Sequence, residues 1–183
     1  MKRKISVFLV VVMMLNTLLL ASCIKPSDSP PSEGLAFELN YDGKSYYVSG
    51  LETCTDTDIV IPSAYNGKPV TSIGDDAFLD CSSLTSITIP DSVTSIGSNA
   101  FYNCTSLTSV TIGNSVTSIK YSAFYGCPAE FDFSRCTSVP SLESTNCFTK
   151  GDGLKIIVPS SLYDEWISAT NWAVHAQYIV AAE

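Results

Sequence analysis

A 23-residue period dominates this chain. Val70, Val93, Val116 and Val139 are each separated by 23 residues. Other apolar positions keep the same step: Ile73, Ile96 and Ile119; Phe78, Phe101 and Phe124; Cys81, Cys104 and Cys127. A unit this short cannot bury its own apolar side chains, so each unit needs a neighbour. The sequence therefore predicts a solenoid whose core exists only as a stack of coils.

Each coil has room for two short strands. In Leu84–Ile89 and its equivalent Leu107–Ile112, apolar residues two apart lie on one face of a strand, so Thr88 and Thr111 should face outward. We expect a first strand near 86–89, a turn at 90–91, a second strand near 93–96, and a helical turn carrying Ala100 and Phe101. The strict period also predicts that four residues line up one above another: Ile87, Val110, Phe133 and Ile156. It places Glu130 and Arg135 at apolar positions, within a poorly matching stretch from 128 to 153.

Both ends of a solenoid expose apolar edges and need caps. At the N-terminal end, two β-rich segments flank Asp42-Gly43, which predicts a hairpin over the first coil. The segment 63–69, with its Asn66-Gly67 turn, is a five-residue insertion that should project from one edge of the stack.

At the C-terminal end, Ser161 and Asp164 suggest a capping box, and Leu162, Trp166 and Ala169 have helical spacing. We interpret Trp166 and Trp172 as a buried end cap in preference to a sugar-stacking pair.

The N-terminus predicts export. Lys2, Arg3 and Lys4 precede the apolar run 5–15, and Asn16-Thr17 interrupts the run before it reaches the roughly 20 residues of a membrane span. Residues 1–22 are therefore interpreted as a cleaved signal peptide in preference to a retained transmembrane anchor.

The end of this segment, Leu20-Ala21-Ser22-Cys23, resembles the lipobox of bacterial lipoproteins. The resemblance implies a lipidated Cys23 and attachment to a membrane. Residues 23–34 are then the acylated cysteine and a flexible, proline-rich tether. Ile24 is not the aspartate associated with inner-membrane retention in some Gram-negative bacteria, which favours the outer membrane if the cell has one.

Charge excludes one class of partner. Removal of the signal peptide takes away three basic residues, which moves the net charge from −8 to −11. A strongly acidic surface without a Lys/Arg cluster does not favour nucleic acid. The remaining 161 residues suit a single domain, folded over 35–183.

Candidate chemistry is sparse, and we predict no enzyme, cofactor or metal. Six cysteines follow Cys23, and three of them share one repeat position, where parallel side chains disfavour disulfides and indicate a buried column of free thiols. His175 is the only histidine, so a pair with Cys147 is improbable. The acidic residues that we considered for calcium do not recur with the coil, and we interpret them as solvated carboxylates: Asp56, Asp58, Asp75, Asp76 and Asp80.

The repeat unit Val93-Thr-Ser-Ile96-Gly-Ser-Asn-Ala100-Phe101-Tyr-Asn-Cys104-Thr-Ser-Leu107 resembles the BspA-like, or treponemal-type, bacterial leucine-rich repeat. The resemblance covers 35–183. It implies a leucine-rich-repeat solenoid, mostly β with short helical turns: a β-hairpin cap and first coil over 35–69, repeats over 70–159, and a helical cap over 160–183.

The resemblance also implies a surface-exposed, lipid-anchored protein of the bacterial cell envelope, in the outer or the cell membrane. It would bind a host or cell-surface macromolecule, as adhesins of this type do. The expected contact face is the flat, polar set Ser86, Thr88, Ser109 and Thr111. Two alternatives stay open: a glycan-binding accessory of nutrient capture, with Tyr65, Tyr102, Tyr121 and Tyr125 as candidates, and a purely structural envelope protein. The sequence leaves the ligand, the oligomeric state, the cell-wall type and the disulfide state of Cys54, Cys136 and Cys147 open.

Overall fold

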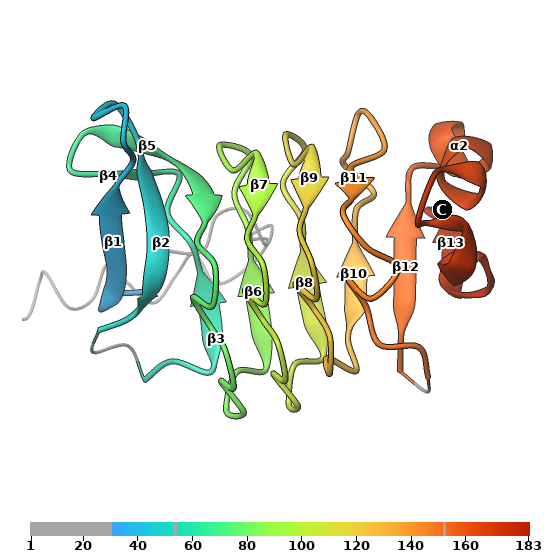
Figure 1. Ribbon diagram of the computed structural model, residues 1–183, viewed down its shortest axis with the longest axis horizontal. Helices are drawn as coiled ribbons and strands as arrows, with labels where there is room; N and C mark the ends of the chain where they lie inside the picture. The colour runs from blue at the N-terminus through green and yellow to red at the C-terminus, as the bar shows by residue number, and fades with distance from the viewer. Residues whose placement is uncertain (1–30, 53–54, 152) are drawn as a thin grey trace, which may run out of the picture.

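The chain stacks its strands in two rows along one long axis, with a hairpin at the N-terminal end and helices at the C-terminal end (Figure 1). The structure is a computed structural model that describes residues 31–52, 55–151 and 153–183. The predicted signal peptide, Cys23 and most of the expected tether lie outside these residues, as does Cys54. Within them, no helix combines the length and the apolar character that crossing a bilayer demands.

The elements follow one another through the chain as β1 (Leu35–Leu39), β2 (Tyr46–Leu51), β3 (Asp58–Val60), β4 (Ala64–Tyr65), β5 (Lys68–Ile73), β6 (Ser86–Thr88), β7 (Ser95–Ile96), β8 (Ser109–Thr111), β9 (Ser118–Ile119), β10 (Glu130–Asp132), β11 (Ser141–Leu142), β12 (Lys155–Val158), η2 (Ser160–Leu162), α2 (Tyr163–Ser168), η3 (Ala173–Tyr178) and β13 (Ile179–Ala181).

The two strands of each coil belong to two different sheets. Sheet A has the order β1-β2-β5-β7-β9-β11, with β4 attached to β5, and sheet B has the order β13-β12-β10-β8-β6-β3. Equivalent strands of successive coils pair in parallel, and Ile87 pairs with Val110 while Ile96 pairs with Ile119. All four of these side chains are buried, and Thr88 and Thr111 lie on the outer face. The predicted strands and their inward and outward sides are confirmed.

The alignment predicted for Phe133 is wrong. Val110 pairs with Phe131, a step of 21 residues, and Phe131 pairs with Ile156, a step of 25. This coil is two residues shorter than the others between Cys127 and Phe131, and two residues longer between Phe133 and Leu142. The two changes cancel, so the 23-residue step is restored at Leu142, which pairs with Ile119. Phe133 takes the next inward position, and its N–H donates to the carbonyl of Ile157.

The same slip corrects the expectation that Glu130 and Arg135 fall at apolar positions. Glu130 occupies an exposed position of β10, and Arg135 lies in the turn after that strand with its guanidinium in solvent. Neither of these charged side chains therefore enters the core.

The expected helical turn at Ala100 and Phe101 is a run of separate hydrogen-bonded turns. Asn99 and Asn103 have left-handed backbones with φ of 52° and 60°, which prevent a continuous helix. The backbone between them pairs with the next coil instead: the Phe101 N–H donates to the carbonyl of Ala123 at 2.7 Å. The coils are thus joined along this side as well as through the two sheets.

Close approach of the coils depends on glycine at some turns. A Cβ on Gly113 would collide with the Pro90 carbonyl of the preceding coil. At the Asn66-Gly67 turn, both residues have positive φ, at 46° and 74°, as the short hairpin between β4 and β5 demands.

The N-terminal cap is the predicted hairpin, in which β1 pairs antiparallel with β2 and β2 continues sheet A beside β5. The insertion at 63–69 lies at this end and packs on the cap, because Tyr65 stacks on Phe37 with ring centroids 4.2 Å apart. Residues just before β1 also join the domain: the Ser32 N–H donates to the Val60 carbonyl at 2.9 Å.

The C-terminal cap buries both tryptophans, as predicted. Trp166 and Trp172 contact each other, with centroids 4.5 Å apart, and Phe133 lies 5.0 Å from Trp166. The predicted capping box is wrong, because α2 begins at Tyr163 after Leu162 and no side chain caps it. The chain then returns to sheet B as β13, a strand that the helical interpretation of 160–183 did not include.

Candidate functional site

The outer face of sheet B holds the predicted binding residues. Ser86 and Ser109 lie in one row of the register, and Thr88 and Thr111 lie in the next. The structure therefore brings all four together on one flat surface of parallel strands. We call this surface, formed by the outward residues of β3, β6, β8, β10 and β12, the sheet B face.

Hydrogen bonding divides these hydroxyls into two groups. Ser86 Oγ donates to Asp58 Oδ1 at 2.7 Å, and Thr85 Oγ1 donates to the same oxygen at 2.9 Å. These bonds hold the pKa of the Asp58 carboxyl below its usual range. Within the part of the chain that the structure describes, the hydroxyls of Thr88, Ser109 and Thr111 make no such bond and are available to a partner.

Sequence reasoning missed the charged margins of the sheet B face. Asp58 shares the row of Ser86 at one end, and Glu130 shares it at the other through the pairing of β8 with β10. Lys155 Nζ lies 2.8 Å from Glu130 Oε2, and both side chains are about half exposed. The charges were recognisable in the sequence, but the slip at Phe131 concealed that Glu130 belongs to the outer row.

Beyond the end of these strands lies a groove of about 400 Å³ beside the Pro62 and Pro90 turns. The ion pair of Arg135 Nη2 with Asp91 Oδ2, at 2.6 Å, borders it. Ser92 also lines the groove, and its Oγ is buried without a hydrogen-bond partner among the described residues. The groove adds polar groups to the edge of the sheet B face.

The tyrosines proposed for glycan binding do not form one group. Tyr65 lies on the N-terminal cap against Phe37 and Tyr46. The other three, Tyr102, Tyr121 and Tyr125, line one hollow on the segments that lead from sheet A to sheet B.

The repeated cysteines follow one another through successive coils as predicted, but only Cys104 and Cys127 are buried, whereas Cys81 is partly exposed. Cys104 Sγ donates to the Phe78 carbonyl at 3.2 Å, and Cys127 Sγ donates to the Phe101 carbonyl at 2.9 Å. Hydrogen bonding to the Cys127 thiol and burial raise the pKa of Cys104. The thiols Cys81, Cys104, Cys127, Cys136 and Cys147 are free in the structure.

Cys147 and His175 are not arranged for catalysis. Cys147 Sγ donates to the Lys120 carbonyl at 3.1 Å, and burial raises the pKa of this thiol. His175 Nε2 lies 3.2 Å from the Thr145 carbonyl, and burial lowers the pKa of the imidazole. Each group is bound to backbone, so neither activates the other.

The acidic residues considered for calcium have other partners in the coil. Asp76 Oδ1 accepts from Asn99 Nδ2 at 3.1 Å, and Asp80 Oδ1 accepts from Asn103 Nδ2 at 2.8 Å. Asp75 Oδ1 accepts from the Ser98 N–H at 2.7 Å. Over the described residues, no three His, Cys, Asp or Glu side chains are gathered as a metal site.

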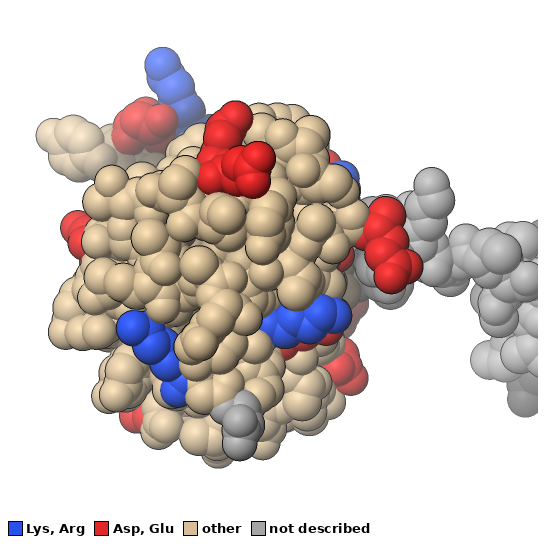
Figure 2. Space-filling view, turned by 90° about the vertical axis from the view of Figure 1, so that its right-hand side faces the viewer, with Lys and Arg blue, Asp and Glu red and all other residues tan. Residues whose placement is uncertain are grey.

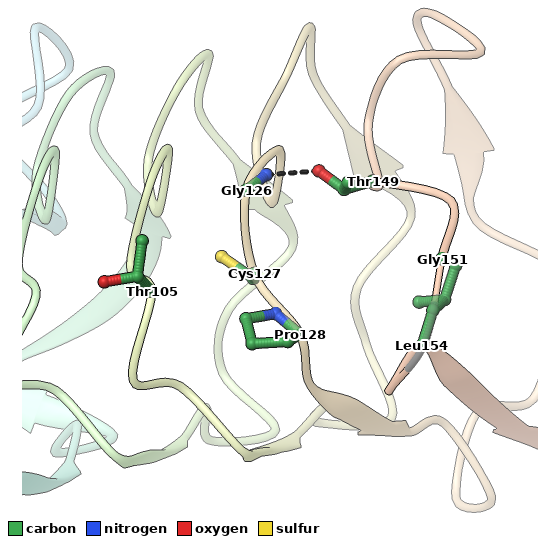
Figure 3. A pocket seen from close by; sticks show the side chains of 7 residues that line it. All are labelled: Thr105, Gly126, Cys127, Pro128, Thr149, Gly151 and Leu154. Carbon is green, nitrogen blue, oxygen red and sulfur yellow. Dashed lines mark hydrogen bonds between the residues drawn. The ribbon is translucent and has the colours of Figure 1, made fainter.

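A smaller pocket of about 220 Å³ lies at the shortened coil (Figure 3). Its wall includes Cys127 and Pro128, and the Gly126 N–H donates to Thr149 Oγ1 across it (Figure 3). The Thr149 hydroxyl is already paired with Gly126, and no charged side chain among the described residues lines the pocket, so it offers little to a ligand.

The C-terminal end of the solenoid has few charges. Figure 2 views this end and shows scattered Lys, Arg, Asp and Glu side chains on a mostly uncharged surface. Val174 and Val180 are among the exposed apolar residues there. Because the tryptophans beneath are fully buried, this surface is the outside of a completed cap.

Taken from the core outward, the chain is a repeat scaffold with a flat polar face and no catalytic constellation among the described residues. Residues 51–165 match the BspA type leucine-rich repeat region, in six copies, and the chain belongs to this family. The family is a non-enzymatic repeat scaffold, and membership indicates a protein-binding or structural role. A comparison with curated proteins gives no match.

Solved bacterial structures share the fold. The Treponema pallidum leucine-rich repeat protein is 22% identical, with a TM-score of 0.55 over 73% of this chain and 66% of that chain. A leucine-rich repeat protein from Bacteroides ovatus is 27% identical, with a TM-score of 0.51 over 70% of this chain and 37% of that chain. This chain thus spans less than two thirds of the length of either protein.

Proposed function

We propose that this chain is a surface-exposed bacterial lipoprotein that binds a host or cell-surface protein through the sheet B face. The observation that carries the proposal is the set of outward hydroxyls on Thr88, Ser109 and Thr111, which form no hydrogen bond within the described part of the chain. Packing explains why Ile87 and Val110 recur, but it does not require hydroxyls on the opposite side of the same strands.

The geometry favours weak contacts that are repeated. Parallel strands are about 4.8 Å apart, so the five strands of the sheet B face span roughly 19 Å, and two outward rows are only about 7 Å wide. The resulting area is far below the roughly 800 Å² per partner of a stable interface. A flat polar patch of this size gains useful affinity when many copies are held on one membrane, because avidity multiplies weak binding.

The binding test compares matched arginine pairs. Thr88→Arg with Thr111→Arg places two bulky cations on the sheet B face, and Ser95→Arg with Ser118→Arg places the same cations on the outward register row of sheet A. On a panel of immobilised extracellular-matrix proteins, we expect the first pair to lose binding and the second pair to retain it. Equal behaviour of both pairs, or no binding by the unmodified chain, would refute the proposal.

Membrane attachment is proposed from the lipobox resemblance at Leu20–Cys23. Two or three acyl chains give a durable anchor where one chain binds only marginally. Cells fed an alkyne fatty acid should label the unmodified chain and leave Cys23→Ser unlabelled. Equal labelling of the two chains would remove the anchor from the proposed function.

A further inference from the structure

A hollow of about 360 Å³ opens on the segments that connect the second strand of one coil with the first strand of the next. This volume is within the range of about 300–1,000 Å³ that small-molecule sites occupy. We call it the tyrosine hollow, and its lining residues are Asn99, Tyr102, Tyr121, Ser122, Tyr125 and Asn146. None of them carries a charge at neutral pH, on a chain that is otherwise strongly acidic.

The repeat itself shows that packing does not demand a tyrosine at position 121. The equivalent residues of the two preceding coils are Asp75 and Ser98. These coils have the same backbone as the coil of Tyr121, with left-handed residues at the following position. The coil therefore does not need the Tyr121 side chain for its packing, and the residue is 51% exposed.

Tyr102 and Tyr125 also line the hollow. Their rings stack at 5.4 Å with an interplanar angle of 15°, and Tyr125 is 41% exposed. The equivalent residue one coil earlier is Leu79, so the coil does not require an aromatic ring at this position. Within the described residues, neither these phenol hydroxyls nor that of Tyr121 takes part in a hydrogen bond.

Ser122 provides an independent indication of a ligand. It is only 4% exposed, lies in the hollow, and has a left-handed φ of 52°. The equivalent residues Asp76 and Asn99 bond to each other across coils at 3.1 Å. The shorter Ser122 side chain does not continue this ladder, and its hydroxyl makes no hydrogen bond in the described structure. The left-handed backbone is common to all three coils, whereas the almost buried hydroxyl without a hydrogen-bond partner is particular to Ser122 and leaves bonding capacity that a ligand can satisfy.

These groups fit a ligand that combines flat C–H faces with neighbouring hydroxyls. The negative face of an aromatic ring attracts C–H groups, and each tyrosine adds a polar tip. The side-chain amide of Asn146 and the free oxygen of Asn99 can bond to adjacent hydroxyl groups of a ring. We propose that the tyrosine hollow binds a neutral saccharide, one or two pyranose units of a longer chain, at a site separate from the sheet B face.

The test measures saccharide binding to the full chain by saturation-transfer NMR, and the dissociation constant of each saccharide that binds. The chain is held in a zwitterionic detergent without a sugar headgroup. The probes are soluble neutral oligosaccharides of glucose, mannose, galactose, xylose and N-acetylglucosamine. We expect at least one series to bind, and Tyr121→Ala and Tyr125→Ala each to weaken it by at least tenfold. Ser122→Gly, which tolerates the positive φ, should weaken it several-fold without changing the thermal midpoint.

Tyr41→Ala is the matched control, because Tyr41 is a fully exposed tyrosine on the N-terminal hairpin, remote from the hollow. It should bind the same saccharide as the unmodified chain does. Binding by none of the probes, unchanged binding after Tyr121→Ala, or capture of a peptide in place of a saccharide would overturn the proposal. The arginine pair Thr88→Arg and Thr111→Arg should leave saccharide binding unchanged, so this site and the protein-binding face fail independently.

Discussion

Removal of one ring from the phenylalanine column should be among the most damaging single changes in this fold. Phe101 is fully buried between Phe78 and Phe124, with both centroid distances at 5.0 Å and both ring pairs nearly parallel. The column continues to Phe148 at 5.6 Å. Each ring therefore packs against the coil before it and the coil after it, so neighbouring coils of the solenoid bury apolar area against the same side chain.

We expect Phe101→Ala to lower the free energy of unfolding by about 4–5 kcal/mol. Truncation of a buried phenylalanine costs about 3–5 kcal/mol, and the cost rises with the volume that the structure fails to refill. Here the coil spacing is fixed from several sides, because β6, β7, β8 and β9 and the turn at Ala123 are all held by backbone hydrogen bonds. The cavity therefore persists, which places the cost in the upper part of the range.

The measurement is urea unfolding followed by circular dichroism, with Tyr102→Ala as the control. Tyr102 is the next residue in the chain and lies outside the core, so its truncation should cost only about 1 kcal/mol. A double-mutant cycle sharpens the test: Phe101 and Phe124 should couple by about 0.5–1.5 kcal/mol, whereas Phe78 and Phe124, which do not touch, should be additive within about 0.5 kcal/mol. A loss below about 2 kcal/mol for Phe101→Ala, or one equal to that of Tyr102→Ala, would refute the shared-core argument.

Three further outcomes follow from particular contacts. Burial lowers the pKa of His175 below the unfolded value of about 6.5. The folded protein is therefore fully stabilised by the neutral imidazole above pH 6.5 and loses this stabilisation as the pH falls from there through the folded-state pKa. The urea midpoint of the parent chain should fall from pH 8 to pH 5, and the midpoint of His175→Asn should change less. Asn103→Ala should cost about 1–2 kcal/mol, through the left-handed φ and the lost bond to Asp80, whereas Asn103→Gly should cost less, as thermal unfolding of the pair will show. Burial raises the pKa of Cys136 to about 12, and the pKa of Cys104 is raised as well, so a disulfide reagent at pH 8 should label both thiols only once urea unfolds the chain.

The repeat predicted the inside of this molecule well, because packing demands the same side chain at each level of a stack. Ile87 and Val110 pair as the period requires, and Phe101 occupies the core beside them. The period failed where one coil lost two residues before Phe131 and gained two before Leu142. Two aromatic residues two positions apart, Phe131 and Phe133, are equally good inward residues, so hydrophobicity alone did not choose between these registers.

The end caps were predictable in kind and less so in detail. The last apolar layer of a stack has to be covered, and two tryptophans after the final repeat, both buried in the structure, cover it. The return of β13 to sheet B depends on its pairing with β12, which lies outside the periodic pattern, and α2 begins at Tyr163 without a side-chain cap that a sequence motif could reveal. Outside the repeats, no equivalent residue 23 positions away indicates which side chains are buried.

Equivalent positions of successive coils differ in whether packing or ligand binding determines the residue type. Three coils present Phe78, Phe101 and Phe124 at one core position, so that residue type is what the fold requires. At a neighbouring surface position the same coils present Asp75, Ser98 and Tyr121, so the fold accepts a carboxylate, a hydroxyl or a ring. A position at which the backbone accepts several residue types can be selected for ligand binding. Tyr121 uses such a position, and the tyrosine hollow forms where its coil meets the coils before and after it.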